Sequence, residues 1–261
     1  MKKILLSPAI LVVLSVGSIR AADPATLATT MSADELAAKL DAIGQGNASI
    51  RTQLEIRTNG GGKRVMQLQI KQRRSKTATD LAYLVIWPND QKGKGVILHQ
   101  KAGEAPTGSL LEPPNKVTEL KSSEMRNGLF DSDLAYQDAV ENFFAWKKQA
   151  VVGTETIQNV SCQILESKPD SPSETIYGRV RSWVDLRRMV PLRVEKYSPS
   201  GELIRRIDTD RVVPDDQHRQ IPARLIVHGP RKDTVTELNG SGVKHDVTFS
   251  DADFTPASIS H

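Results

Sequence analysis

The stretch SIRTQLEIRTNGGGKRVMQLQIK, residues 49–71, decides the fold. Apolar and polar side chains alternate along it, and alternate residues of a β-strand point to opposite faces of a sheet. The run Asn-Gly-Gly-Gly at residues 59–62 interrupts the alternation and is typical of a hairpin turn. The stretch therefore predicts a β-hairpin whose apolar face is formed by Leu54, Ile56, Met66, Leu68 and Ile70.

Similar runs recur at short intervals through the rest of the chain. They predict strands at residues 80–87, 95–101, 109–111, 117–120, 150–156, 160–166, 177–185, 191–197, 203–212, 223–228, 234–238 and 247–249. Most connections between these runs are too short for a crossover helix, which favours antiparallel pairing.

Two segments have the pattern of helices instead. Ser32 and Glu35 have the spacing of a capping box, before an apolar stripe that ends at Gly44. Residues 133–144 suit a second, short helix. These elements predict a mainly β fold, a single strongly curved antiparallel sheet of about a dozen strands. Such a sheet is an incomplete β-barrel, and one or two helices are expected to close its concave side.

The N-terminus has the order of charge and hydropathy of a signal peptide. Lys2 and Lys3 precede an apolar run at residues 4–16, and small residues follow it. The apolar run is shorter than the ~20 residues that a membrane span needs. We therefore expect residues 1–22 to be a signal peptide cleaved near Ala21 or Ala22. No composition shift divides residues 23–261, which predict one exported, soluble domain.

The single cysteine, Cys162, limits the class of exported protein. It lies far from the cleavage site, so the chain lacks the lipid-bearing cysteine of a bacterial lipoprotein. One thiol also excludes an intramolecular disulfide. Because Cys162 stands between Val160 and Ile164 in an alternating run, we expect a buried thiol on a strand.

The charge balance gives no support for nucleic-acid binding. The chain has 35 Lys+Arg and 31 Asp+Glu, and loss of residues 1–22 leaves 32 against 31. A nucleic-acid partner requires a concentrated basic surface. The one basic cluster, at residues 71–76, is interpreted as the solvated end of a hairpin, with contact to an acidic membrane or partner surface as the alternative.

Motifs of catalysis and metal binding are absent from the sequence. The five histidines are scattered without an H-E-x-x-H pair, and no G-x-S-x-G elbow is present. Three acidic pairs, Asp131/Asp133, Asp208/Asp210 and Asp251/Asp253, are better explained as surface turns than as cation ligands. We expect no catalytic residue, no metal and no cofactor.

Residues 128–138, GLFDSDLAYQD, resemble the central segment of outer-membrane lipoprotein-sorting proteins, the LolA-like family. Residues 183–185, Trp-Val-Asp, followed by Pro191, Tyr197 and Gly201, are similar to that family's W-[IV]-D…P…Y…G run. Asp253 and Phe254 match its closing segment. The resemblance covers roughly residues 30–256, and it departs from the family at residues 134–135, where Leu-Ala stands in place of Phe-Ser.

The resemblance implies a periplasmic carrier that holds acyl chains of lipoproteins or other lipids in an apolar hollow. The expected lining residues are Leu54, Ile56, Met66, Leu68 and Ile70 and, across the hollow, Val180, Val184, Leu192 and Val194. The expected lid residues, after a flexible Asn-Gly turn, are Phe130, Leu134, Phe143 and Phe144. An inner-membrane transporter or an outer-membrane acceptor is the implied protein partner, and the chain is expected to be a monomer.

Three alternatives stay open on the sequence alone. The inner face of the sheet could be an ordinary filled core, because a cavity and a core require the same alternation. The same fold also implies a lipid-sensing regulatory protein of the periplasm. A hydrolase with a site assembled from distant loops is the third alternative.

Export is directly testable. Protein recovered from the periplasm should have an intact mass that corresponds to a start at Ala22 or Asp23, with no added lipid. A mass that includes Met1, or that of an acylated terminus, would contradict the predicted signal peptide.

Overall fold

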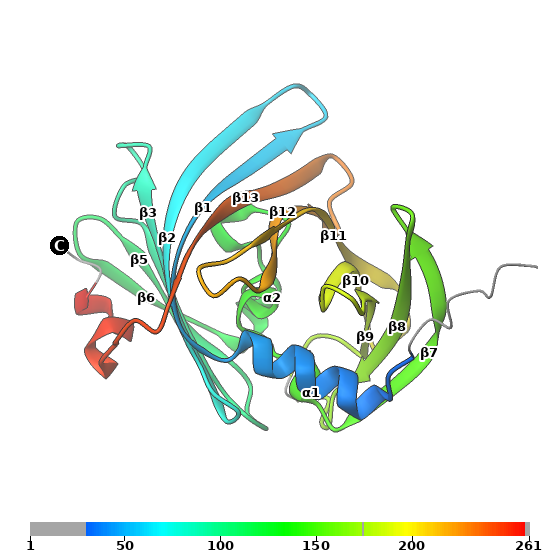
Figure 1. Cartoon of the computed structure of the whole chain (residues 1–261). Coiled ribbons are helices and arrows are strands. Elements are labelled where there is room, and N and C mark those ends of the chain that lie inside the picture. Colours follow the sequence, from blue (N-terminus) through cyan, green and yellow to red (C-terminus); the bar gives the residue numbers. More distant parts are fainter. Residues whose placement is uncertain (1–29, 174, 259–261) are drawn as a thin grey trace, which may run out of the picture. The chain divides into compact units, whose positions relative to one another are not determined.

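The computed structural model describes residues 30–173 and 175–258, of which those from Met31 onward belong to one compact unit, Met31–His261 (Figure 1). The expected signal peptide at residues 1–22 lies outside the described residues. Among the helices in the described part of the chain, none has the length and hydropathy required to cross a membrane.

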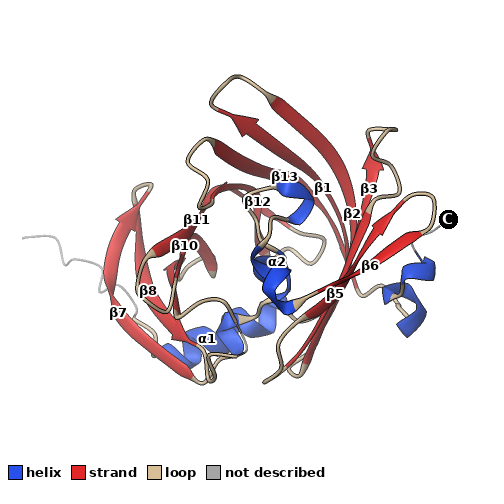
Figure 2. Ribbon diagram, turned by 180° about the vertical axis from the view of Figure 1, so that it is seen from behind, coloured by secondary structure: helices blue, strands red, loops and turns tan. Residues whose placement is uncertain are grey.

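One sheet of thirteen strands dominates this unit, in the order β6-β5-β4-β3-β2-β1-β13-β12-β11-β10-β9-β8-β7. Its strands are β1 (Gly46–Thr58), β2 (Lys63–Arg74), β3 (Ala78–Trp87), β4 (Gly95–Lys101), β5 (Thr107–Glu112), β6 (Lys116–Leu120), β7 (Lys148–Ile157), β8 (Val160–Lys168), β9 (Arg179–Asp185), β10 (Val190–Tyr197), β11 (Leu203–Pro214), β12 (Gln220–His228) and β13 (Thr234–His245). All neighbouring pairs are antiparallel. The predicted mainly β fold, with a single curved and unclosed sheet, is confirmed (Figures 1 and 2).

The hairpin β1–β2 forms as its sequence predicts. Leu54 pairs with Met66 and Ile50 with Ile70, so the apolar side chains of both strands lie on one face. This face is the concave, inner face of the sheet, and it continues onto β3 and β4. A cluster of buried side chains from these strands forms the largest core of the unit.

Helix α1 (Ala33–Gly44) begins where its cap predicts, since the Ser32 side chain accepts a hydrogen bond from the Glu35 backbone N–H (3.3 Å). Its buried Leu36 and Leu40 pack on the inner face of β8 and β9, against Leu165 and Val184. The second helix is shorter than predicted. Only Tyr136–Val140 is α-helical (α2), and single 3-10 turns flank it.

One predicted strand is wrong, and one is too short. Residues 247–249 form no ladder; instead Phe249 packs edge-on against Phe254, with ring centroids 5.5 Å apart, on the outer face of the sheet. Conversely, β13 continues to His245 and pairs along most of β1. The expectation for Cys162 is confirmed, because the thiol is free and buried on β8.

The two edge strands, β6 and β7, are consecutive in the chain but lie at opposite ends of the sheet. Residues 121–147 connect them, and we call this stretch the crossing segment. It contains α2 and three 3-10 turns, at Ser122–Arg126, Leu129–Asp131 and Phe143–Ala145, and it passes over the concave face (Figure 2). The segment therefore covers apolar surface that an open sheet would otherwise expose to water.

The core of this unit predicts a contrast between two leucines. Leu68 has no exposed surface, whereas Leu203 is 46% exposed. Leu68→Ala should lower the free energy of unfolding by about 2–5 kcal/mol, because it removes buried methyl groups and leaves a cavity. The matched control Leu203→Ala should change it by less than about 0.5 kcal/mol. Urea unfolding measures both, and equal effects would contradict the packing described above.

Candidate functional site

Buried ion pairs hold the crossing segment on the sheet. Asp138 of α2 lies 2.8 Å from Lys196 Nζ of β10 and 3.1 Å from Arg205 Nε of β11. The three side chains are between 0% and 3% exposed. Burial by itself raises the pKa of the Asp138 carboxyl, but the two cations more than offset this and lower its pKa below the ordinary value. Asp138 is therefore an ionised anchor within the fold.

Asp133 is a second anchor of the same segment. Its carboxylate accepts hydrogen bonds from the hydroxyls of Thr234 (2.7 Å) and Thr236 (2.8 Å), both on β13. Its backbone carbonyl accepts a hydrogen bond from Arg205 Nε (2.6 Å). Asp131 is exposed as a surface turn requires, but for Asp133, which is 1% exposed, that interpretation is wrong. The acidic pair thus has one solvated and one buried member.

Glu141 lies beside these anchors in a less favourable environment. Burial raises the pKa of its carboxyl to about 7, although Lys196, with Nζ 3.7 Å away, lowers it in part. Gln137 donates a hydrogen bond to one Glu141 oxygen (3.0 Å). Lys196 also stands over the rings of Tyr177 and Phe143, 5.0 and 5.3 Å from their centroids. Lys196 thus interacts with two carboxylates and with two aromatic rings.

Two hollows flank the crossing segment on the inner face. The larger, of about 270 Å³, lies between β1–β3 and β12–β13, and the smaller, of about 170 Å³, lies toward β4 and β5. Apolar lining residues of the larger hollow include Ile50, Ile70, Leu134, Ala223, Leu225 and Leu238. The smaller hollow is lined by Met66, Val96, Leu110, Phe130 and Tyr136, among others. The crossing segment contributes to both hollows and divides the concavity between them.

The expected lining of the first hairpin is divided between core and hollow. Leu54, Ile56 and Leu68 lie in the filled core, in contact with the crossing segment's cluster. Ile70 lines the larger hollow and Met66 the smaller. The inner face is therefore neither entirely cavity nor entirely core.

The expected lining from β9 and β10 does not form one surface. Val184 packs against α1, Val180 is fully buried, and Val194 is half-buried on the same inner face. The placement of Leu192 beside them is wrong, because a β-bulge between Pro191 and Arg193 shifts the alternation. Leu192 consequently packs on the outer face, with Trp183.

The four expected lid residues lie in two places. Phe130 and Leu134 border the hollows. Phe143 and Phe144 instead pack against each other near α1, with ring centroids 4.4 Å apart and planes tilted by 53°. The Asn-Gly pair before them is not a loose turn. Gly128 bridges to Ala135, and a Cβ at Gly128 would lie 1.9 Å from the Ser132 carbonyl oxygen, so only glycine fits this closed loop.

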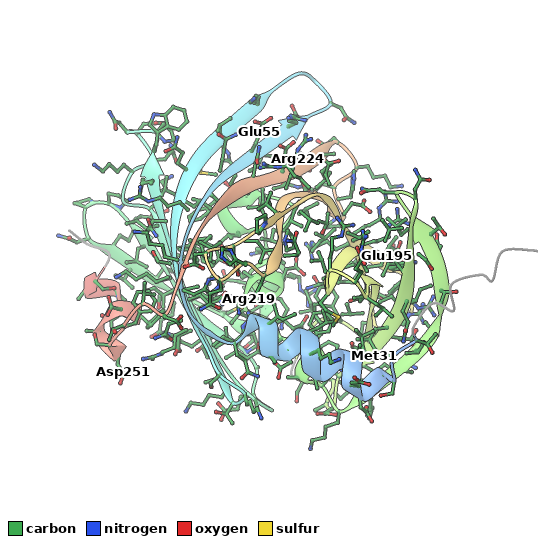
Figure 3. All side chains as sticks on the ribbon, viewed as in Figure 1. Met31, Glu55, Glu195, Arg219, Arg224 and Asp251 are labelled. Atoms are coloured by element: carbon green, nitrogen blue, oxygen red, sulfur yellow. The ribbon has the colours of Figure 1, made fainter. Side chains whose placement is uncertain are left out.

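The outer face carries paired charges. In the basic cluster at residues 71–76, Lys71 binds Asp253 (2.8 Å), and Arg73 binds Asp80 and Asp251 (2.8 Å each). Asp251, labelled in Figure 3, lies on the 3-10 turn after β13. The interpretation of the whole cluster as a solvated hairpin end is therefore wrong for these two residues, which hold the C-terminal turns on the sheet.

A group of possible metal ligands lies at the end of β13, where single ligand atoms of Asp215, Asp216 and His245 are within 4.8 Å of one another. Protein groups already satisfy them. Arg219 Nε donates to Asp215 (2.9 Å), and the His245 backbone N–H donates to Asp216 (2.8 Å). The expectation of no metal and no cofactor stays a prediction.

Lys196 and Arg205, the cations that anchor the crossing segment, are not among the site residues predicted from the sequence. A signal was present, because Lys196 occupies an inward position two residues after Val194, where alternation predicts an apolar side chain. A charged residue at such a position requires a buried partner. The sequence alone did not show which acidic residue would supply it.

Comparison with known proteins places this arrangement in a recognised fold. A protein-family model described as "Uncharacterized protein" matches residues 82–261, and the chain belongs to that family. No curated protein matches the chain. The predicted LolA-like resemblance is confirmed in the fold by the solved structures described next.

A domain assigned as an outer membrane lipoprotein-sorting protein from Vibrio parahaemolyticus is 17% identical, with a TM-score of 0.78 over 88% of this chain and 98% of that one. A DUF1329 family protein from Desulfovibrio piger is 20% identical, with a TM-score of 0.78 over 87% and 97%. A LolA superfamily protein from Nitrosomonas europaea is 19% identical, with a TM-score of 0.69 over 87% and 98%. At these identities the likeness establishes a shared fold.

The raised pKa of Glu141 predicts a dependence of stability on pH. Between its ordinary value of 4.5 and about 7, the folded protein keeps a proton that the unfolded chain has released. The stabilisation is thus complete below pH 4.5 and is lost as the pH rises to 7, by on the order of 3 kcal/mol. Glu141→Gln should remove this slope from the free energy of unfolding, measured by urea titration at each pH.

The exposed Glu119→Gln is the matched control and should retain the wild-type slope. Asp138 has a lowered pKa, so its contribution to the free energy of unfolding changes only below pH 4, where it increases as the pH rises. It therefore does not obscure the decrease expected from Glu141 at higher pH. Identical slopes for wild type and Glu141→Gln would show that Glu141 is ionised in the folded protein throughout this range.

Proposed function

We propose that this protein is a periplasmic carrier that holds an acyl chain of a lipoprotein or another lipid in the larger hollow. The observation that carries the proposal is the position of that hollow. It is an apolar space of about 270 Å³ on the inner face of the sheet, next to a tightly packed core. If the inner face served only stability, side chains would fill this space as they fill the adjoining core.

The size of the hollow is adequate for useful affinity. Each buried CH2 group contributes about 0.8 kcal/mol, so ten of them would contribute about 8 kcal/mol. This corresponds to a Kd of about 1 μM before the costs of association. The costs of association weaken this value, which favours reversible binding and release of the tail.

Entry of a longer chain requires part of the crossing segment to move. Asp138 and Asp133 anchor it to β10, β11 and β13, whereas Phe130 and Asp131 have left-handed backbone conformations, with φ of 52° and 58°. Such conformations are costly for residues other than glycine. We infer that the part around Phe130, which precedes both anchors, opens, while Asp133 and α2 stay in place.

The wider role follows the resemblance to lipoprotein-sorting proteins. The chain is exported by its signal peptide, takes up a lipidated cargo and moves it towards the outer membrane without a chemical step. An inner-membrane transporter would supply the cargo, or an outer-membrane acceptor would receive it. Lipid sensing remains the second function that the same hollow supports.

Filling the hollow tests the proposal. Ala223 faces the hollow, so Ala223→Phe should occupy it and weaken binding of a neutral fluorescent dodecanoyl amide at least tenfold. The matched control Val152→Phe adds the same ring at a position that is 45% exposed and should bind like wild type. Fluorescence titration measures the affinity and the melting temperature checks the fold. A folded Ala223→Phe variant with wild-type affinity would contradict the proposed site.

A further inference from the structure

The larger hollow has a polar end. Gln72, Tyr83 and His245 line it there, beyond the apolar side chains of Ile70 and Leu238. Ile70, Gln72 and Arg74 are alternate residues of β2, so all three share the inner face. Arg74 is the next inward position after Gln72, roughly 7 Å further along the strand.

Arg74 is a half-buried cation without a carboxylate partner among the described residues. Its Nε is shielded from solvent and meets no hydrogen-bond acceptor. Arg73, its neighbour on the outer face, has two carboxylates at 2.8 Å. The carboxylate whose charge acts on Arg74 is that of Asp41, and its oxygens already accept hydrogen bonds from the amides of Gln45 and Asn142 (2.7 Å each).

The Arg74 guanidinium has a hydrogen-bond donor, Nε, without an acceptor among the described residues. Burial lowers the pKa of Arg74, although Tyr83 and Asp41 raise it in part, which shows that its charge is poorly compensated. The guanidinium is a planar fork of donors that matches a carboxylate with two parallel hydrogen bonds. Arg74 is not itself a lining residue of the hollow, but its charge interacts with Tyr83, which is one. An apolar hollow that ends near such a poorly compensated cation is complementary to an amphiphile with an anionic head.

We propose that Arg74 binds the carboxylate of a single-chain fatty acid whose hydrocarbon tail occupies the larger hollow. This inference rests on the proposed function and names the ligand class of the same site. A single chain suits a space of about 270 Å³, and the carboxylate supplies the opposite charge that Arg74 lacks among the ion pairs of the described residues. A ligand without an anionic head would leave that charge poorly compensated.

Arg74 also has a structural explanation. Its Nη1 lies beside Gly44, the last residue of α1, where a Cβ would be 3.7 Å away. The C-terminus of a helix is negative and attracts cations. In that case Arg74→Gln would lower the melting temperature without changing which ligand is preferred, so stability and preference must be measured together.

The experiment compares dodecanoate with dodecanol, which have equal chain length, at pH 8 by isothermal titration calorimetry. The quantity of interest is the ratio of the two Kd values. Arg74→Gln should reduce the preference for dodecanoate about tenfold, equal to 1.4 kcal/mol, relative to wild type. Arg73→Gln removes the same charge from the adjacent, outward position and should leave the ratio unchanged.

Arg74→Lys keeps the charge but loses the fork, so its ratio should fall between those of wild type and Arg74→Gln. If Arg74→Gln does not fold, Arg74→Lys is the variant whose ratio of Kd values is compared with that of wild type. Equal ratios in wild type and in the folded Arg74 variants would overturn the inference, while binding of both ligands would leave the carrier intact. Binding of neither ligand to wild type would instead overturn the proposed function.

Discussion

The structure depends on one buried electrostatic contact, that between Asp138 of the crossing segment and the pair Lys196 and Arg205 of the sheet. An unclosed sheet has a wide inner face that water would reach unless another part of the chain covered it. Here the connection between the two edge strands does so. Removing one partner of a buried ion pair leaves an uncompensated charge and costs about 3–5 kcal/mol. Together with the anchor that Asp133 forms on β13, this contact fixes where the cover sits.

The two hollows remain because the cover is anchored at only a few points, Asp133 and Asp138 among them. Over part of β1 and β2 the cover and the sheet pack completely, as the fully buried Leu54 and Leu68 show. Elsewhere the segment leaves space in two places, one bordered by Leu134 and the other by Phe130. A molecule built in this way combines a rigid centre with a movable margin. That combination suits reversible uptake of an apolar chain better than either a solid core or a fully open trough.

Alternation predicted most of the sheet because it is a local property that each strand displays by itself. The first hairpin, the pairing directions and the cap at Ser32 all follow from residues close in sequence. Leu192 was misplaced because a β-bulge changes the period without a marker in the sequence. Residues 247–249 alternate, but no neighbouring strand is free to pair with them.

The site was harder to predict because it depends on contacts between distant residues. Lys196 and Asp138 are far apart in the chain, and only the folded sheet brings them together. Whether an inward leucine meets another side chain or an empty space is also decided by distant elements. Leu68 and Leu238 show the same pattern in sequence, yet one lies in the core and the other borders the hollow.

The most direct test of the central claim is to locate a bound acyl chain by methyl NMR. With Ile and Leu methyl groups labelled, titration with dodecanol should shift the signals of Ile50, Ile70, Leu225 and Leu238, which line the larger hollow. The signals of Leu54 and Leu68 in the packed core should change little. Saturable shifts confined to the hollow are the result predicted here. Shifts confined to the outer face, or none at concentrations near the solubility limit of the ligand, would contradict the claim that this protein carries an acyl chain.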